Sequence, residues 1–400
     1  MPGPLQGMRV VELGFWVAGP AAAGIMADWG ADVIKIEPPT GDPFRGLFAV
    51  VAGVQVPINP PFELDNRGKR SIALNLLSDE GHAVASELLK RADVFVSNLR
   101  PAALARVGLD YHRVQAINER LVYCLVSGYG PAGPDRDRPA YDIGAFWARA
   151  AIAASLEPSG SDPPQQRGGM GDHTTAIAAV SAICAALLAR QRTGKGQFVS
   201  TSLLRTGAYV LGWDVNIRLR FGMLDPPYDR FGVPNPLLNC YRSGDGRWFW
   251  LLGLQGDRHW PDVIRAIEQP ELLQDEHFKD IRVRRENNAA CVRALDAAFN
   301  ARPMAHWAEV FDREGVWWAP VQSVDDLVTD PQARAGGLFV DTPVAEGMAE
   351  MVASPADFAD TPWQPASMAP EFGQHTEEIL LDLGYDWQRI AALRERGAIG

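Results

Sequence analysis

The first 130 residues alternate short apolar runs with amphipathic segments. Residues 8–13 (MRVVEL) form a run with β-branched residues, and a glycine-containing turn leads from it into a predicted helix over 20–29. A second apolar run covers 31–37, directly after Gly30. Strands that alternate with helices indicate a parallel sheet with helices on both faces. We therefore expect an α/β fold.

The same alternation continues to residue 130. It predicts a helix over 79–91, a strand over 92–98, a helix at about 114–118 and a strand that begins at Leu121. Parallel sheets bind ligands at the carboxyl ends of their strands. We therefore expect the site to lie after Leu13, Glu37, Val96 and Val126.

The next 75 residues contain loops and one long apolar segment. Residues 131–171 are rich in Pro, Gly and Asp around one predicted helix, 143–156. Residues 173–192 are almost all apolar, which predicts a buried helix that ends at Gly194. Residues 198–204 follow as a strand or the start of a helix.

From Phe221 the composition changes, and tryptophans occur in the neighbouring pairs WFW and WW. A hairpin is predicted around Gly244-Asp245-Gly246, with helices over 261–267 and 287–300. A chain of 400 residues exceeds one ordinary domain. We expect a large domain over 1–205, a linker over 206–225, a small α+β domain over 226–325, and a return linker with the last part of the large domain over 326–400.

Charge and composition narrow the partners. Lys and Arg number 38 against 49 Asp and Glu, a net charge of −11, and no basic block is present, so nucleic-acid binding is not expected. The uncharged run 174–189 is too short for a membrane span, and the first ten residues lack an export-signal pattern, which predicts a cytoplasmic protein. Four widely spaced cysteines indicate neither a disulfide framework nor a metal site.

Asp172 is the strongest candidate for a catalytic carboxylate in the sequence. It lies in the segment RGGMGDHTT, where Gly168, Gly169 and Gly171 allow close backbone approach, and an apolar helix follows. In one interpretation Asp172 is the N-cap of that helix. In the other it is a nucleophile at the positive end of the helix, in a cleft poor in water. The residues alone leave both open.

Other candidates carry weaker signals. The first turn lacks the GxGxxG spacing, and Glu37 is either a ribose ligand or a solvated strand end. The cluster NRGKR (66–70) is either a solvated loop or a phosphate site. His173 follows Asp172, but neighbours on a helix point about 100° apart, so they form no catalytic pair. GxSxG, HExxH and GxxxxGK[ST] motifs are absent.

Several segments together resemble the class III CoA-transferase family, which includes formyl-CoA transferase, carnitine CoA-transferase and α-methylacyl-CoA racemase. They are residues 5–45, NRGKRSIALNLLSDEG, ADVFVSNLRPAALARVGLD, VSGYGPAGP, the block from GGMGDHTT to FVSTSLL, and near the end DPQARA and GQHTEEILLDLG. The resemblance is strong over about 1–205, patchier in the tryptophan-rich region and good again at the C-terminus. It implies a Rossmann-like large domain, and a homodimer of two interlocked ring-shaped chains.

The resemblance also implies a nucleophilic aspartate, aligned with Asp172, and coenzyme A (CoA) as co-substrate without a metal. That carboxylate would pass through acyl anhydride and aspartyl-CoA thioester intermediates between an acyl-CoA and a carboxylic acid. The family's CoA contacts fall on Val17, Ala18, Leu74, Asn75, Asn98, Arg100, Arg106 and Tyr141.

The chain departs from family patterns at three places. Pro38 stands where some members carry a phosphate-binding arginine, and no glycine-rich loop occurs between 225 and 265, which argues against oxalate or formate as substrate. Tyr141 occupies the place of the racemase histidine, and a phenol is a poor base at neutral pH. We expect an acyl-CoA:carboxylate CoA-transferase. The alternatives are an acyl-CoA racemase or isomerase and a non-catalytic CoA-binding protein.

The tryptophan-rich region also leaves two interpretations. Its aromatic residues either form an ordinary core or line a pocket for a bulky apolar acyl group. The residues concerned are Trp248, Trp250, Trp260, Trp317 and Trp318.

Overall fold

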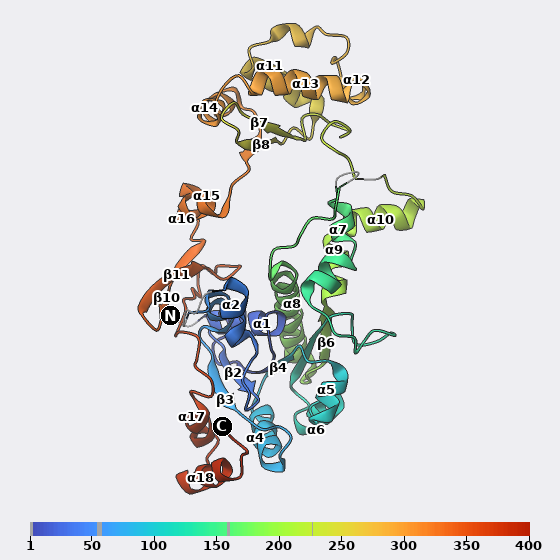
Figure 1. Cartoon of the computed structure of the whole chain (residues 1–400). Helices are drawn as coiled ribbons and strands as arrows, with labels where there is room; N and C mark the ends of the chain where they lie inside the picture. The colour runs from blue at the N-terminus through green and yellow to red at the C-terminus, as the bar shows by residue number, and fades with distance from the viewer. Residues whose placement is uncertain (1–2, 54–57, 158–160, 226) are drawn as a thin grey trace. The chain divides into compact units, whose positions relative to one another are not determined.

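A six-stranded parallel sheet forms the centre of the larger part of the molecule (Figure 1). The computed structural model describes residues 3–53, 58–157, 161–225 and 227–400. The strands lie in the order β3-β2-β1-β4-β5-β6, which is the order of doubly wound dinucleotide-binding sheets. They are β1 (Arg9–Leu13), β2 (Asp32–Glu37), β3 (Arg70–Ala73), β4 (Val94–Ser97), β5 (Val122–Ser127) and β6 (Phe198–Ser202). The predicted α/β fold with a parallel sheet is confirmed.

Helices cover both faces of this sheet, so its strands are buried on both sides. Strands β4 and β5 are mostly apolar, whereas β1 and β2 also bury the charged side chains of Glu12, Lys35 and Glu37. On one face the core contains residues of α1 and α8 packed on Val10, Val94 and Val122. On the other, residues of α4, α6, α17 and α18 pack on Val11 and Phe95. These helices are α1 (Ala18–Asp28), α4 (Asp79–Lys90), α6 (Tyr111–Ile117), α8 (Met170–Thr193), α17 (Thr376–Asp382) and α18 (Trp387–Glu395).

Shorter elements complete this part of the chain. They are α2 (Phe44–Ala52), α3 (Pro60–Asn66), α5 (Pro101–Arg106), the π-helical η1 (Ile143–Ala148), α7 (Ile152–Ser155), α9 (Leu203–Val210), α10 (Gly212–Phe221) and the antiparallel hairpin of β10 (Phe339–Val344) and β11 (Gly347–Val352). The single helix predicted over 143–156 is thus wrong. A left-handed residue, Ala151, at φ 70°, separates η1 from α7.

The remaining elements form a smaller α+β arrangement. Three antiparallel strands, β7 (Cys240–Arg242), β8 (Trp248–Leu251) and β9 (Trp318–Pro320), pack against helices, and the predicted hairpin around Asp245 is confirmed by the β7–β8 pairing. The helices are α11 (Gly256–Ala266), η2 (Pro270–Leu273), α12 (Ile281–Glu286), α13 (Asn288–Phe299), α14 (Met304–Glu314), α15 (Val324–Thr329) and α16 (Pro331–Ala335).

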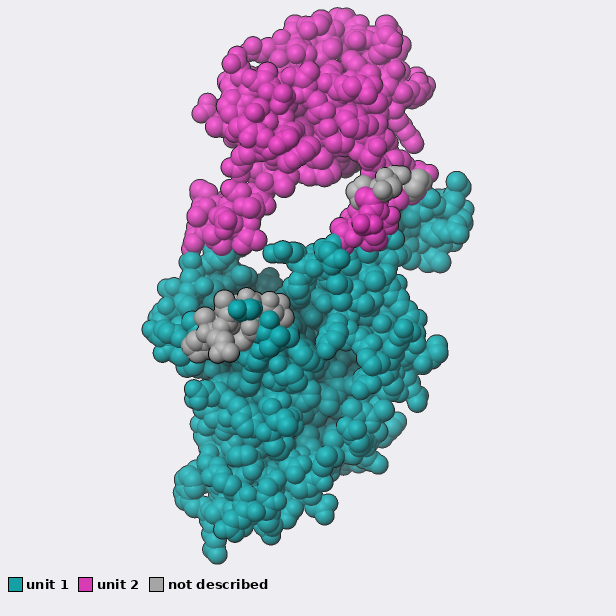
Figure 2. All heavy atoms as spheres, in the orientation of Figure 1, with its two compact units in different colours: residues 1–154, 165–224, 336–400 teal, residues 155–164, 225–335 magenta. Residues whose placement is uncertain are grey.

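The chain divides into two compact units, coloured separately in Figure 2. Unit 1 comprises 1–154, 165–224 and 336–400, and unit 2 comprises 155–164 and 225–335. In the segment we expected to be a linker, 206–225, the structure has most of α9 and all of α10, both within unit 1. The division into a large and a small domain with the expected bounds stays a prediction.

Helix α8 was predicted to be buried, and only one of its faces is. Ala176, Ala179 and Ile183 lie in the core, whereas Ile177 and Leu188 are exposed. By length and composition α8 is also the one helix in the described ranges that would suffice to cross a bilayer. Its packing against α1 and the sheet accounts for the apolar composition of the buried face.

Candidate active site

Asp172 lies in the first turn of α8 and is not its N-cap. The helix begins at Met170, after Gly169, whose φ of 79° is in the left-handed region that glycine adopts without strain. No side chain caps this helix end. The capping interpretation is therefore wrong, and the Asp172 carboxylate is not committed to the helix backbone as a cap.

The surroundings of Asp172 favour its neutral form more than water does. Burial, together with the nearby carboxylates of Asp142 and Asp65, raises the pKa of Asp172 to about 7, although the charge of His173 opposes this rise. A carboxyl group that titrates near neutral pH keeps a substantial ionised fraction there. It is also more basic and more nucleophilic than an ordinary exposed aspartate.

Helix η1 supplies one wall beside Asp172. A Cβ atom at Gly171 would lie 2.6 Å from Cγ of Phe146, so the absence of a side chain at Gly171 lets the Phe146 ring pack directly on α8. Asp142 caps η1 by accepting a hydrogen bond from the Ile143 amide at 2.8 Å. No local pattern pointed to Asp142 as part of the site, because its position beside Asp172 depends on the packing of η1 on α8. Its second oxygen accepts from Nε2 of Gln166 at 2.9 Å.

His173 points to α3 and not to Asp172, as the helical spacing predicts. Its Nε2 lies 3.1 Å from Oδ1 of Asp65, a buried residue. Burial alone would lower the pKa of His173, but the hydrogen bond and charge of Asp65 outweigh it and raise that pKa. The surroundings of His173, one residue beyond the candidate nucleophile, therefore favour its protonated form more than water does.

The turn between β1 and α1 is fixed by the side-chain amide of Asn98. Its Oδ1 accepts from the Phe15 amide at 3.0 Å, and its Nδ2 donates to the Phe15 carbonyl at 2.7 Å. A Cβ at Gly14 or Gly19 would lie 3.2 or 3.0 Å from the Asn98 side chain, which explains the glycines in this turn. Asn98 thus holds the turn that carries Val17 and Ala18.

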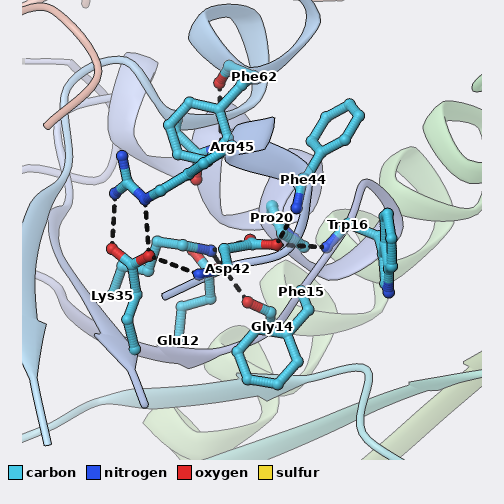
Figure 3. Close-up of polar contacts among 12 residues, drawn as sticks. Glu12, Gly14, Phe15, Trp16, Pro20, Lys35, Asp42, Phe44, Arg45 and Phe62 are labelled. Carbon is cyan, nitrogen blue, oxygen red and sulfur yellow. Dashed lines mark hydrogen bonds and ion pairs between the residues drawn. The ribbon is translucent and has the colours of Figure 1, made fainter. Parts of the chain in front are cut away.

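A buried ionic network lies beneath the same turn (Figure 3). Glu12 on β1 is paired with Lys35 on β2 at 2.9 Å and with Lys69 at 2.6 Å. Lys35 also lies 3.0 Å from Asp42, and its Nζ donates to the Gly14 carbonyl at 2.9 Å. Burial alone would raise the pKa of Glu12, but the two ammonium groups outweigh it and hold that pKa below its usual value.

The network corrects two interpretations of the sequence. Glu37 is neither a ribose ligand nor a solvated strand end: it is buried and pairs with Arg45 at 2.6 Å. In the NRGKR cluster, Arg67 and Lys69 are buried and paired with Asp28 and Glu12. The cluster is therefore neither a solvated loop nor a phosphate site, and its last residue, Arg70, begins β3, a strand that the sequence did not reveal.

The residues expected to contact CoA fall into two groups in unit 1. Val17, Ala18, Asn98 and Tyr141 gather around the first turn, where the Tyr141 ring contacts that of Trp16. The others lie along the neighbouring elements. Leu74 is fully buried and its amide donates to the Glu37 carbonyl, Asn75 follows it, and Arg100 and Arg106 mark the beginning and the last turn of α5.

The five tryptophans singled out in unit 2 divide between the core and the surface. Trp260 is buried and Trp318 is half-buried in the core, as the core interpretation predicts. Trp248 and Trp250 instead alternate with buried residues on β8 and are exposed, and Trp317 is also exposed. The core interpretation is wrong for these three. A role in acyl binding stays a prediction.

Comparison with known proteins decides the family. The model of "CoA-transferase family III" matches residues 5–376. The chain belongs to CoA-transferase family III. It is 33% identical to the (R)-2-hydroxy-4-methylpentanoate CoA-transferase of Clostridioides difficile, over 96% of this chain and 97% of that protein. It is 31% identical to the succinate–glutarate CoA-transferase of Agrobacterium fabrum, over 95% and 96% of the two chains.

A solved structure shows the same fold. The chain superposes on a CAIB/BAIF family protein from Brucella suis with a TM-score of 0.83 and 29% identity, over 96% of this chain and 100% of the other. The predicted resemblance is thereby confirmed, and the chain is a class III CoA-transferase that acts on acyl-CoA and carboxylic acids. The non-catalytic alternative is wrong. In the described residues no group of three or more His, Cys, Asp or Glu side chains could hold a metal ion.

Proposed function

We propose that this family III enzyme transfers CoA between an acyl-CoA and a carboxylic acid through covalent intermediates on Asp172. The observation that carries the proposal is the position of this carboxylate. It lies in the first turn of α8 behind Gly169 and Gly171, is free of any capping role, and has a pKa of about 7. A carboxylate suits this task because the anhydride it forms is reactive enough for a thiolate to reopen.

The reaction balances in four displacements without net proton transfer. An Asp172 oxygen attacks the donor thioester carbonyl, the C–S bond breaks, and CoA leaves as thiolate from a mixed anhydride. The thiolate attacks Cγ of Asp172, which forms the aspartyl-CoA thioester and releases the donor carboxylate. The acceptor carboxylate then attacks Cγ and expels the thiolate. The thiolate finally attacks the acceptor acyl carbon, which gives the new acyl-CoA and frees Asp172.

The proposed CoA site follows the first turn and α5. Asn98 fixes the turn carrying Val17 and Ala18, so their backbone offers rigid contacts near the thioester. Because the Leu74 side chain is buried, Leu74 contributes through its backbone, next to Asn75. Arg100 and Arg106 on α5 supply positive charge for phosphates, and Tyr141 lies beside the thioester end.

The proposed assembly is an interlocked homodimer. Helix α10 has no buried residue in the single chain, and its Trp213, Leu219 and Phe221 are exposed. Large apolar side chains on an exposed helix are typical of a surface that packs against another chain. Light scattering in solution tests this: two chains of 43.7 kDa support the dimer, and one chain overturns it.

The covalent step is tested by trapping. The enzyme is incubated with a panel of acyl-CoAs, quenched with hydroxylamine and mapped by peptide mass spectrometry. A hydroxamate on Asp172 is expected in the wild type and in the control Gly168→Ala, and none in Asp172→Ala. Failure of every donor to modify Asp172, while acids exchange into acyl-CoA, would overturn the proposal.

The same samples separate transfer from racemisation. Racemisation would introduce solvent deuterium at the acyl α-carbon and leave Asp172 unmodified. Tyr141 stands where the racemase branch has a histidine, and its phenol is a poor base at neutral pH. We therefore expect no α-deuterium beyond the enzyme-free control.

A further inference from the structure

Trp16 adopts a backbone conformation that a tryptophan rarely accepts. Its φ is 65°, in the left-handed region. A bulky residue there costs on the order of 1–3 kcal/mol and persists only where its surroundings impose it. Glycine would fit the backbone better at this position. A tryptophan in so strained a turn indicates that the indole itself has a use.

Two devices impose the conformation. Oδ1 of Asp42 accepts hydrogen bonds from the amides of Trp16, at 3.2 Å, and Phe44, at 3.0 Å (Figure 3). Asp42 is itself held by the buried Lys35 at 3.0 Å. On the preceding residue, Asn98 satisfies both backbone groups of Phe15. The buried ionic network therefore ends in the backbone of Trp16.

The strained turn places the indole against two other aromatic rings. The Trp16 and Tyr141 rings meet edge to face, with centroids 5.6 Å apart and an interplanar angle of 89°. The centroid of the buried Phe44 ring lies 6.4 Å from that of Trp16. Tyr141 is 60% exposed, and Trp16 is only partly buried. The pair thus keeps aromatic surface available to a ligand.

This pair is connected to the nucleophile through η1. The Tyr141 carbonyl accepts hydrogen bonds from the amides of Gly144 and Ala145, each at 3.0 Å, so Tyr141 leads directly into η1. Phe146 of η1 packs on Gly171, the residue before Asp172. The aromatic pair and the nucleophile are therefore held by one packed unit.

The charges around this turn do not suit a second carboxylate on the substrate. The buried ammonium groups of Lys35 and Lys69 are paired with two carboxylates, Glu12 and Asp42, and the guanidinium of Arg45 is paired with Glu37. Each of these cations is already neutralised. A dicarboxylic acid would find no free positive partner among them, whereas an apolar group would find aromatic surface.

We propose that Trp16 and Tyr141 form an aromatic wall that selects flat or branched apolar acyl groups over short or dicarboxylic ones. This inference rests on the proposed function, since it concerns the acyl group that reacts with Asp172. Edge-to-face contacts with an aromatic acyl group add to its burial, and their strength corresponds to about a threefold to tenfold gain for each ring pair.

The test is the exchange of a labelled acid into its own CoA ester, which needs no knowledge of the natural acceptor. Four pairs are compared: phenylacetate, 4-methylpentanoate, acetate and succinate, each with its CoA thioester. The wild type is expected to exchange the first two at least about tenfold more efficiently, in kcat/KM, than the last two.

Trp16→Gly removes the ring while glycine accepts the φ of 65° without strain, so misfolding does not mimic the effect. In this variant we expect the ratio of kcat/KM for the two apolar acids to that for acetate and succinate to fall to about threefold or less. Trp16→Phe should retain most of it. Trp387→Ala, at an exposed tryptophan of α18, is the control and should leave it unchanged.

The outcomes separate the two proposals. Exchange of all four acids without preference, a preference for succinate, or a preference that survives in Trp16→Gly overturns the aromatic wall and leaves the transferase proposal standing. Absence of exchange with every acid, together with an unmodified Asp172, overturns both.

Discussion

His173 Nε2 lies 3.1 Å from Oδ1 of Asp65, a contact that joins the first turn of α8 to the last turn of α3 across 108 positions of sequence. Asp65 is buried, so burial raises the pKa of its carboxyl group, and the hydrogen bond and charge of His173 oppose that rise. The charged groups around Asp172 are then Asp142 from η1, Asp65 from α3 and His173 from α8 itself. Burial and, after it, the balance among these charges set the ionisation of the nucleophile.

The first prediction concerns the pH dependence of exchange. Because ionised Asp172 attacks, kcat/KM should rise with pH through about 7. His173→Gln removes a positive charge beside Asp172, which raises its pKa and moves the rise to higher pH. Asp142→Asn removes a negative charge and moves it to lower pH. Profiles of kcat/KM from pH 5.5 to 9 measure both shifts.

The control for these profiles is His277→Gln, a change at an exposed histidine in unit 2 that pairs with Asp275. It should leave the profile where it is. Shifts of the same sign in His173→Gln and Asp142→Asn would contradict the electrostatic account, since a purely structural disturbance does not depend on the sign of the charge removed.

The second prediction concerns the cost of Asp172 to the fold. The pKa of Asp172 is raised from 3.8 to about 7, so the folded protein binds more protons than the unfolded chain between these values, and stability falls as pH rises through this window. Asparagine does not ionise, so Asp172→Asn does not lose stability in this way. Its advantage over the wild type should grow from about pH 4 to pH 7 and then level off at about 2 kcal/mol, after allowance for partial exposure.

Denaturant unfolding of both proteins at pH 5 and pH 8 measures that difference. Asp360→Asn, at an exposed carboxylate, is the matched control and should leave the stability unchanged. An advantage of Asp172→Asn that is equal at the two pH values would show that ionisation of Asp172 is not the source of the cost.

The third prediction concerns the buried network under the first turn. Glu12→Gln leaves Lys35 and Lys69 without their shared carboxylate in a buried site, and we expect a loss of about 3–5 kcal/mol. Glu87→Gln breaks an exposed pair with Lys90 and should cost less than about 0.5 kcal/mol. Denaturant midpoints compare the two variants. Equal, small losses would mean that the network does not hold the turn.

The sequence predicted the parts of the fold whose signal is local. Strands β1, β2, β4 and β5 are largely buried, and each has at least three apolar residues within a segment of four to six, which is the local signal of a buried strand. Strand β3 was not predicted, because two of its four residues, Arg70 and Ser71, are polar. Their partners, Asp32 and Glu37, lie on the neighbouring strand, which the local sequence does not reveal. A basic cluster in sequence thus became a set of buried ion pairs in the fold.

The sequence predicted the site residue that lies in a local motif, but it did not predict the residues that join the site through contacts between distant segments. Glycines before an apolar helix marked Asp172, although the helix starts three residues earlier than expected because Gly169 takes the left-handed cap position. Asp142, Asp65 and the strained Trp16 act through residues distant in sequence. No local pattern identifies a pairing such as that of Asp65 with His173, or a positive φ at a tryptophan.

The last prediction concerns the close contact between α8 and η1. A Cβ at Gly171 would lie 2.6 Å from Cγ of Phe146, and Phe146 is buried, so its ring has no free space to enter. Gly171→Ala should therefore displace η1, with Asp142 and Tyr141, from the nucleophile. We expect kcat for exchange to fall by about tenfold or more, with a stability loss of about 1–3 kcal/mol.

Gly168→Ala is the matched control, because a Cβ there meets nothing within 4 Å. It should change kcat by less than about twofold. The double variant Gly171→Ala with Phe146→Leu restores room for the added methyl group, so part of the lost kcat should return, and the two changes should couple by about 1 kcal/mol. A Gly171→Ala enzyme with unchanged kcat, or a double variant whose losses simply add, would show that this contact does not position η1 against Asp172.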